Sequence, residues 1–168
     1  MNIKNIRKNE KGLTLIETVI YMGLLSILLV VLTDMLVSIL DLRLETQAVS
    51  AVDQDGKFII QRLNYDVSRS DSITTPANPG DTSSTLVLDI DGESYTYSIS
   101  GNQLDLTNNS GTQSLSGSES IISDLEFRKL GPAAKRTVVQ TEFTVTSDAE
   151  LNKGTEVRNF RTVFGVRQ

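Results

Sequence analysis

The chain has 168 residues, 39% hydrophobic and only 5% aromatic, which allows one domain of ordinary size in addition to a membrane segment. It contains neither Cys nor His. Disulfide bonds and thiol nucleophiles are therefore excluded, and the commonest general base and metal ligand are missing. We expect a protein that is not an enzyme and needs no cofactor.

Charge is distributed unevenly along the chain. The net charge is −5 overall, yet residues 1–12 carry +3, from Lys4, Arg7, Lys8 and Lys11 against Glu10. Such a split favours opposite sides of a membrane, with the basic end in the cytoplasm. The acidic remainder has no clustered basic face, which argues against a nucleic-acid partner.

An apolar segment follows the basic end. Residues Leu13–Thr33 contain a single charge, Glu17, and as a helix they span roughly 31 Å, enough to cross a bilayer once. A carboxylate near the middle of such a helix costs on the order of 2.5–3.5 kcal/mol, so its presence calls for a function. In the simplest alternative, the segment is an uncleaved signal anchor whose Glu17 snorkels to the cytoplasmic boundary.

The segment KGLTLIE, followed by an apolar run, resembles the class III leader of type IV prepilins and type II secretion pseudopilins. The resemblance implies cleavage between Gly12 and Leu13 by prepilin peptidase and N-methylation of Leu13, although these families most often have Phe at this position. It also gives Glu17 a role in assembly, in which its carboxylate neutralises the new terminal ammonium of a neighbouring subunit. Such a buried pair fixes register more than it stabilises.

The helix is expected to continue beyond the membrane to about Ser70. One apolar face has spacings of 4, 4, 3, 4 and 4, formed by Ala48, Val52, Gly56, Ile59, Leu63 and Val67. Polar residues lie largely off this face, namely Asp53, Gln54, Lys57, Gln61 and Arg62. Gly56 is a possible soft point in the helix, and the stretch from Ser72 to Gly80 is rich in turn formers.

After Gly80 the hydrophobic period changes to two, which predicts strands. Leu86, Leu88 and Ile90 alternate with polar residues, Asp91-Gly92 favours a type I′ turn, and Tyr95, Tyr97 and Ile99 alternate again, so that the tyrosines pack across strands. Leu104 and Leu106 indicate a third strand. We expect a loop over 108–120, with at most a short strand at Leu115, and further strands at Ile121–Leu130, Thr137–Thr146 and Val157–Val166.

These elements predict an α+β fold, with a long N-terminal membrane-spanning helix packed on a C-terminal antiparallel β-sheet. This is also the pilin architecture. The helix end, the meander and the final strand resemble minor pseudopilin J and the PilW-like minor pilins. We expect four regions: a cytoplasmic leader peptide (1–12), a transmembrane and assembly helix (13–40), an extracytoplasmic amphipathic half (41–70) and a sheet domain (71–168).

Asp89, Asp91 and Glu93 place carboxylates at alternate positions around a glycine, which makes them weak candidates for calcium ligands. A full EF-hand loop is absent, and acidic residues at a hairpin turn are usually solvated. We therefore expect no metal site.

The leading hypothesis is a minor pilin or pseudopilin, anchored in the cytoplasmic membrane with its N-terminus inside and its sheet domain outside. It would later join other pilin or pseudopilin subunits in a pilus or secretion pseudopilus. The alternative is a single-pass anchored binding module that forms no filament. The two differ at the leader, because a simple anchor has no use for cleavage after Gly12 or for Glu17.

Overall fold

The computed structural model describes residues 12, 14–131, 137–149 and 154–166. The chain divides into two compact units, Met1–Leu40 and Asp41–Gln168. The helix α1 (Leu15–Arg69) contributes to both units, and every described strand belongs to the second. The α+β, pilin-like class expected from the sequence is confirmed.

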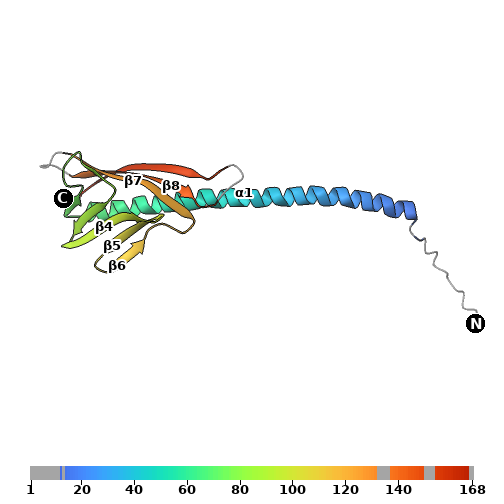
Figure 1. Ribbon diagram of the computed structural model, residues 1–168, viewed down its shortest axis with the longest axis horizontal. Helices are drawn as coiled ribbons and strands as arrows, with labels where there is room; N and C mark the ends of the chain where they lie inside the picture. Colours follow the sequence, from blue (N-terminus) through green and yellow to red (C-terminus); the bar gives the residue numbers. More distant parts are fainter. Residues whose placement is uncertain (1–11, 13, 132–136, 150–153, 167–168) are drawn as a thin grey trace, which may run out of the picture. The chain divides into compact units, whose positions relative to one another are not determined.

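The strands form two antiparallel sheets in place of the single sheet expected (Figure 1). The first has the order β1-β3-β4-β5-β6, with β1 (Ser72–Thr75), β3 (Leu86–Ile90), β4 (Glu93–Ser100), β5 (Gln103–Asn108) and β6 (Gly111–Ser114). The second has the order β2-β7-β8-β9, with β2 (Thr82–Ser83), β7 (Ser120–Leu130), β8 (Val138–Ser147) and β9 (Val157–Gly165).

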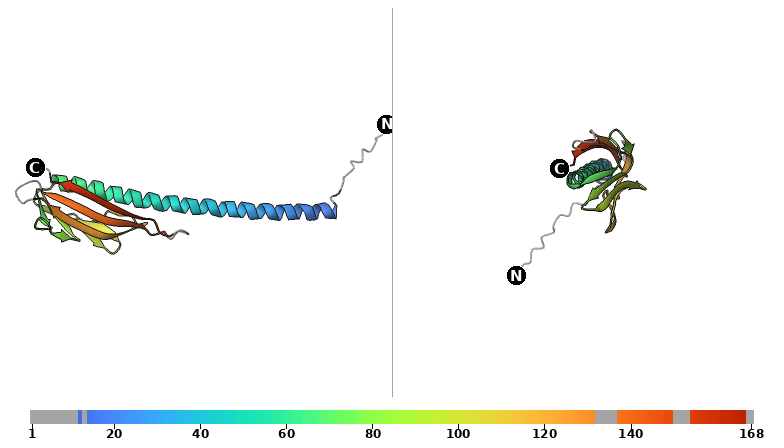
Figure 2. Two further views of the ribbon diagram at one scale, coloured as in Figure 1. Left: turned by 90° about the horizontal axis from the view of Figure 1, so that it is seen from above. Right: turned by 90° about the vertical axis from the view of Figure 1, so that its left-hand side faces the viewer.

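Within the second unit, both sheets curve around one side of α1 (Figure 2). The predicted stripe from Ala48 to Val67 is buried at all six positions, so the face assigned from helical periodicity is the face that the sheets cover. The stripe enters one continuous core with the inward side chains of β3, β4, β5, β7 and β8. Among the largest buried side chains are Tyr97, Phe127 and Phe143.

Gly56 is a packing residue, and its role as a soft point in the helix stays a prediction. The helix is regular through Gly56, which is buried. A Cβ at this position would lie 2.2 Å from Cζ of Phe160, whose ring stacks on Phe143 with a centroid distance of 5.3 Å. The missing side chain is therefore what lets β9 lie against α1.

The central hairpin agrees with its sequence signals. Asp91 and Gly92 have φ values of 54° and 77°, as the type I′ turn requires. Leu86 pairs with Tyr97, which pairs in turn with Leu106, so the predicted three-stranded meander is confirmed.

Three edge segments differ from the expectation. Residues 72–75 form β1 instead of a turn, because Ile73 is buried and the strand pairs with β3. The expected loop over 108–120 contains β6, which ends just before Leu115 and pairs with β5. The two-residue strand β2, paired with β7, was not predicted. Both β2 and β6 are held by backbone pairing with little burial, which leaves no alternating apolar pattern in the sequence.

Candidate functional site

The first turn of α1 is built by a polar cap. Because α1 begins at Leu15, Thr14 is the N-cap residue, and its Oγ1 accepts a hydrogen bond from the N–H of Glu17 at 3.3 Å. The Thr14 carbonyl accepts from the N–H of Thr18 at 3.1 Å and from its hydroxyl at 3.3 Å. Thr14 and Glu17 have the residue types and spacing of a capping box, and a carboxylate here also faces the positive end of the helix dipole.

The Glu17 side chain points along the helix to Tyr21. The Tyr21 hydroxyl donates to Glu17 Oε1 at 2.9 Å, one turn further along. The sequence analysis identified Glu17 but missed this partner, although the spacing of four residues was the available signal. In the part of the chain that the structure describes, the second carboxylate oxygen, Oε2, accepts no hydrogen bond.

From Val19 to Thr33, α1 carries no charge and is exposed throughout. An 18-residue window of α1 reaches a mean hydropathy of 2.5 with none of it buried, so the helix has the length and composition to cross a membrane. Its hydroxyl groups bond within the helix: Ser26 donates to the Met22 carbonyl and Thr33 to the Leu29 carbonyl, both at 2.8 Å. Such internal pairing is what an apolar solvent demands.

The predicted cleavage site lies at the edge of the described residues. Gly12 is exposed, and no atom lies within 4 Å of the position that a Cβ would take there. Leu13, the predicted methylation site, lies outside the described residues. The cleavage and methylation predictions therefore remain predictions.

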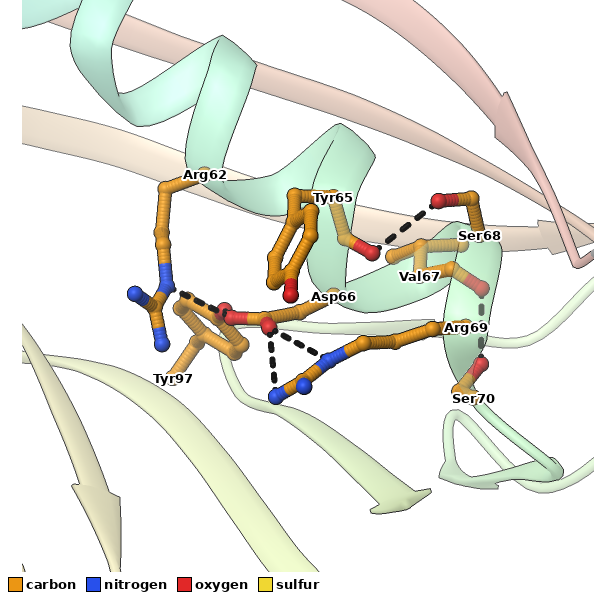
Figure 3. A network of polar contacts seen from close by, with 8 residues as sticks. All are labelled: Arg62, Tyr65, Asp66, Val67, Ser68, Arg69, Ser70 and Tyr97. Carbon is orange, nitrogen blue, oxygen red and sulfur yellow. Dashed lines mark hydrogen bonds and ion pairs between the residues drawn. The ribbon is translucent and has the colours of Figure 1, made fainter.

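A second polar site lies at the C-terminal end of α1, where three side chains converge on the buried carboxylate of Asp66 (Figure 3). Arg62 Nε donates to Oδ2 at 2.7 Å, Arg69 Nε donates to Oδ1 at 3.2 Å, and the hydroxyl of Tyr97 on β4 donates to Oδ2. The Asp66 side chain is 0% exposed, against 32% for Arg62 and 36% for Arg69. A charge so deeply buried needs this degree of pairing.

The network also changes the protonation chemistry of Tyr97. Burial raises the pKa of Tyr97 strongly, and the hydrogen bond to Asp66 and the charge of that carboxylate raise the pKa further. Tyr97 is therefore a neutral hydrogen-bond donor at ordinary pH. The sequence analysis recognised the alternation that buries Tyr97 but missed Asp66, whose signal was a charge on the apolar face with arginines four residues before and three after.

Two more aspartates connect α1 to the second sheet. Asp53 pairs with Arg158 on β9. Asp55 accepts hydrogen bonds from the Gly117 N–H at 2.9 Å and from the hydroxyl of Ser120. Residues that look like solvated positions in the sequence thus attach the helix to the strands.

The acidic hairpin uses its carboxylates locally. Asp89 Oδ1 accepts from the Gly92 N–H at 3.1 Å, and Asp71 Oδ2 accepts from the Asp91 N–H at 2.9 Å. Among the described residues, Glu93 included, no group of three or more acidic side chains is arranged to hold a metal ion.

Comparison with known proteins locates one motif in the first unit. Residues 7–33 match the family model of the prokaryotic N-terminal methylation motif. No curated protein and no solved structure matches the chain. The motif supports a type IV pilin-like or pseudopilin protein, and it implies processing by prepilin peptidase and assembly with other pilins. Together with the apolar helix, it indicates a membrane-anchored protein.

Proposed function

We propose that the chain is a minor pilin or pseudopilin, a structural subunit that enters a type IV pilus or secretion pseudopilus through α1. Prepilin peptidase cuts between Gly12 and Leu13, and Leu13 becomes the N-methylated terminus. The observation that carries the proposal is how the two carboxylate oxygens of Glu17 are bonded. Its carboxylate stands on an uncovered apolar helix with one oxygen held by Tyr21 and the other oxygen, Oε2, available to a cation.

The physical role of Glu17 follows from the two charges that assembly brings together. Cleavage creates an ammonium at Leu13, and the bundle of subunit helices is a medium of low dielectric. Either charge alone is costly there, so a docked subunit with both is favoured over one that lacks either. The pair then selects one axial position of each subunit against its neighbour.

The proposal assigns a place to each region of the chain. The leader 1–12 and the N-terminus are cytoplasmic, 13–40 crosses the cytoplasmic membrane, and 41–70 and 71–168 lie outside before entry into the filament. The basic residues of 1–12 support this orientation. The pattern-level likeness to minor pseudopilin J and PilW-like minor pilins supports a minor subunit, in type II secretion or a related pilus system.

Cleavage is tested by the intact mass of the membrane-extracted chain from cells with an active prepilin peptidase. We expect a chain that begins at Leu13 with a methylated amine, and a Gly12→Val variant that keeps its leader. A chain that still begins at Met1 contradicts the proposal. Gly23→Val is the matched control, because an added Cβ meets no atom within 4 Å at either glycine.

Assembly is tested by Glu17→Ala. The variant should insert into the membrane and be cleaved as the wild type is, since it loses only a charge that opposes burial. Crosslinking to filament neighbours, compared at equal membrane abundance, should fall. In a simple anchored binding module the substitution is silent, so unchanged crosslinking and filament output would refute the assembly role.

A further inference from the structure

Tyr21 differs from the other hydroxyl residues of the apolar segment in what it binds. Thr18, Ser26 and Thr33 donate their hydroxyl groups to backbone carbonyls of the preceding turn. The Tyr21 phenol donates instead to a side chain, Oε1 of Glu17. Its hydrogen bond therefore goes to the one carboxylate of the segment and not to a backbone carbonyl of the helix.

Helix geometry explains the contact. Long side chains on a helix point back towards its N-terminus, so a tyrosine four residues after a glutamate lies over that glutamate. The backbone N–H of Glu17 is also fixed, through Thr14. Glu17 is thus held at two points, the main chain by Thr14 and the carboxylate, through Oε1, by Tyr21.

We propose that Tyr21 is a positioning residue for Glu17, holding Oε1 so that Oε2 faces the incoming terminal ammonium of a neighbouring subunit. This inference rests on the assembly role proposed above and specifies how the carboxylate is prepared. A carboxylate has about four acceptor positions, so one phenol leaves capacity for a cation. The phenol also supplies a donor to a charge that has no water around it in the membrane.

Positioning by Tyr21 lowers the conformational entropy that the Glu17 side chain loses when a neighbouring subunit docks. A free Glu17 side chain samples several rotamers, and each docking event would have to select one of them. With the phenol in place, the carboxylate is already restricted, and less entropy is lost when the ammonium arrives. Tyr21→Phe removes the hydroxyl and keeps the ring, so it isolates this effect from packing.

The first experiment is a double-mutant cycle in the full chain, expressed with its filament partners in the native host. Crosslinking to neighbours is measured at equal membrane abundance for the wild type, Tyr21→Phe, Glu17→Ala and the double variant. We expect Tyr21→Phe to lower crosslinking about threefold to tenfold in the wild-type background and to have no further effect beside Glu17→Ala. Ser26→Ala, which also removes one hydroxyl, is the control and should match the wild type.

The second experiment does not depend on assembly. The infrared band of the Glu17 carboxylate is isolated in lipid bilayers as the difference between the full-length wild type and Glu17→Gln. Tyr21→Phe should shift this band, whereas Ser26→Ala should leave it in place. An unmoved band overturns the positioning role even where Glu17→Ala impairs assembly.

The remaining outcomes are also decisive. A shifted band with wild-type crosslinking in Tyr21→Phe shows a contact without a role in docking and overturns the inference. Equal losses from Tyr21→Phe with and without Glu17 point to plain ring packing and overturn it as well. A silent Glu17→Ala refutes the proposed function itself, and with it the inference, whatever the band shows.

Discussion

Replacing Asp66 with alanine should destabilise the second unit, Asp41–Gln168, far more than replacing any exposed aspartate of α1. The substitution removes the carboxylate on which Arg62, Arg69 and Tyr97 converge. The arginines have about a third of their side-chain surface exposed and can turn to water. Tyr97 is 0% exposed, so its hydroxyl proton is left buried without an acceptor, because the neighbouring Arg62 guanidinium can only donate.

The cost follows from these exposures. An orphaned buried hydroxyl costs about 1–3 kcal/mol, and each partly exposed arginine pair contributes up to about 1 kcal/mol. We therefore expect Asp66→Ala to lower the free energy of unfolding by about 2–4 kcal/mol. The matched control is Asp53→Ala, because Asp53 and its partner Arg158 are both partly exposed, at 28% and 40%, and its loss should stay below about 1 kcal/mol.

Urea unfolding of the fragment 41–168 measures these differences, and a cycle with Tyr97→Phe isolates the orphaned hydroxyl. Tyr97→Phe alone should cost about 1 kcal/mol, since Asp66 keeps both arginines. In the Tyr97→Phe background, Asp66→Ala should cost about 1–2 kcal/mol less than in the wild type. Equal costs for Asp66→Ala and Asp53→Ala, or a coupling of zero, would refute the reasoning.

Four further predictions concern the second unit. The fragment 41–168 should fold alone, since stripe and sheets bury one another, and a coil-like circular dichroism spectrum would contradict this. Gly56→Ala should lower the free energy of unfolding in urea by about 1 kcal/mol or more, although alanine has a higher helix propensity than glycine. The loss should be smaller in the Phe160→Ala background, where the ring that meets the new Cβ is absent. A single variant that is more stable than the wild type would contradict this. Because the pKa of Tyr97 is raised above its ordinary value of about 10, its stabilisation is complete below that pH and declines above it. Unfolding titrations should show the wild type losing up to about 1.4 kcal/mol per pH unit more than Tyr97→Phe above pH 10; parallel curves would contradict this. Thr141→Val should raise stability by roughly 1 kcal/mol, because no hydrogen-bond partner for the buried Thr141 Oγ1 lies among the described residues, and a loss measured in urea would count against it.

The elements that the sequence predicts well are those in which buried apolar residues recur at a regular spacing. The stripe from Ala48 to Val67 repeats with the helical period, and the alternation in β3 and β4 repeats with the period of a strand, so both could be assigned from residue spacing. The edge strand β6 is exposed at all four positions, and it is held to β5 by backbone pairing and by one hydrogen bond between the hydroxyls of Thr107 and Thr112. Side-chain spacing carries no information about such a strand.

The polar contacts divide in the same way. Glu17 could be identified from the sequence alone, because it is the single charge in an apolar segment. Asp66 could not be paired with Tyr97, because the hydrogen bond joins residues 31 apart and depends on how the first sheet lies over the helix. Asp55 is similar, since its partner Ser120 is 65 residues away. Local spacing finds the charge, but only the tertiary structure identifies what neutralises it.

The packing of β9 against α1 affects the order in which the chain can fold during its synthesis. Asp53 and Arg158 are 105 residues apart, and β9 is the last strand that the structure describes. The helix is therefore synthesised long before the strand whose Phe160 ring covers Gly56, and closing so long a loop is slow compared with forming a helix. A chain that stalls before β9 leaves uncovered the Gly56 region of α1 and the face of Phe143 on which Phe160 stacks. That unfinished chain is the species that a folding helper or a quality-control protease would encounter.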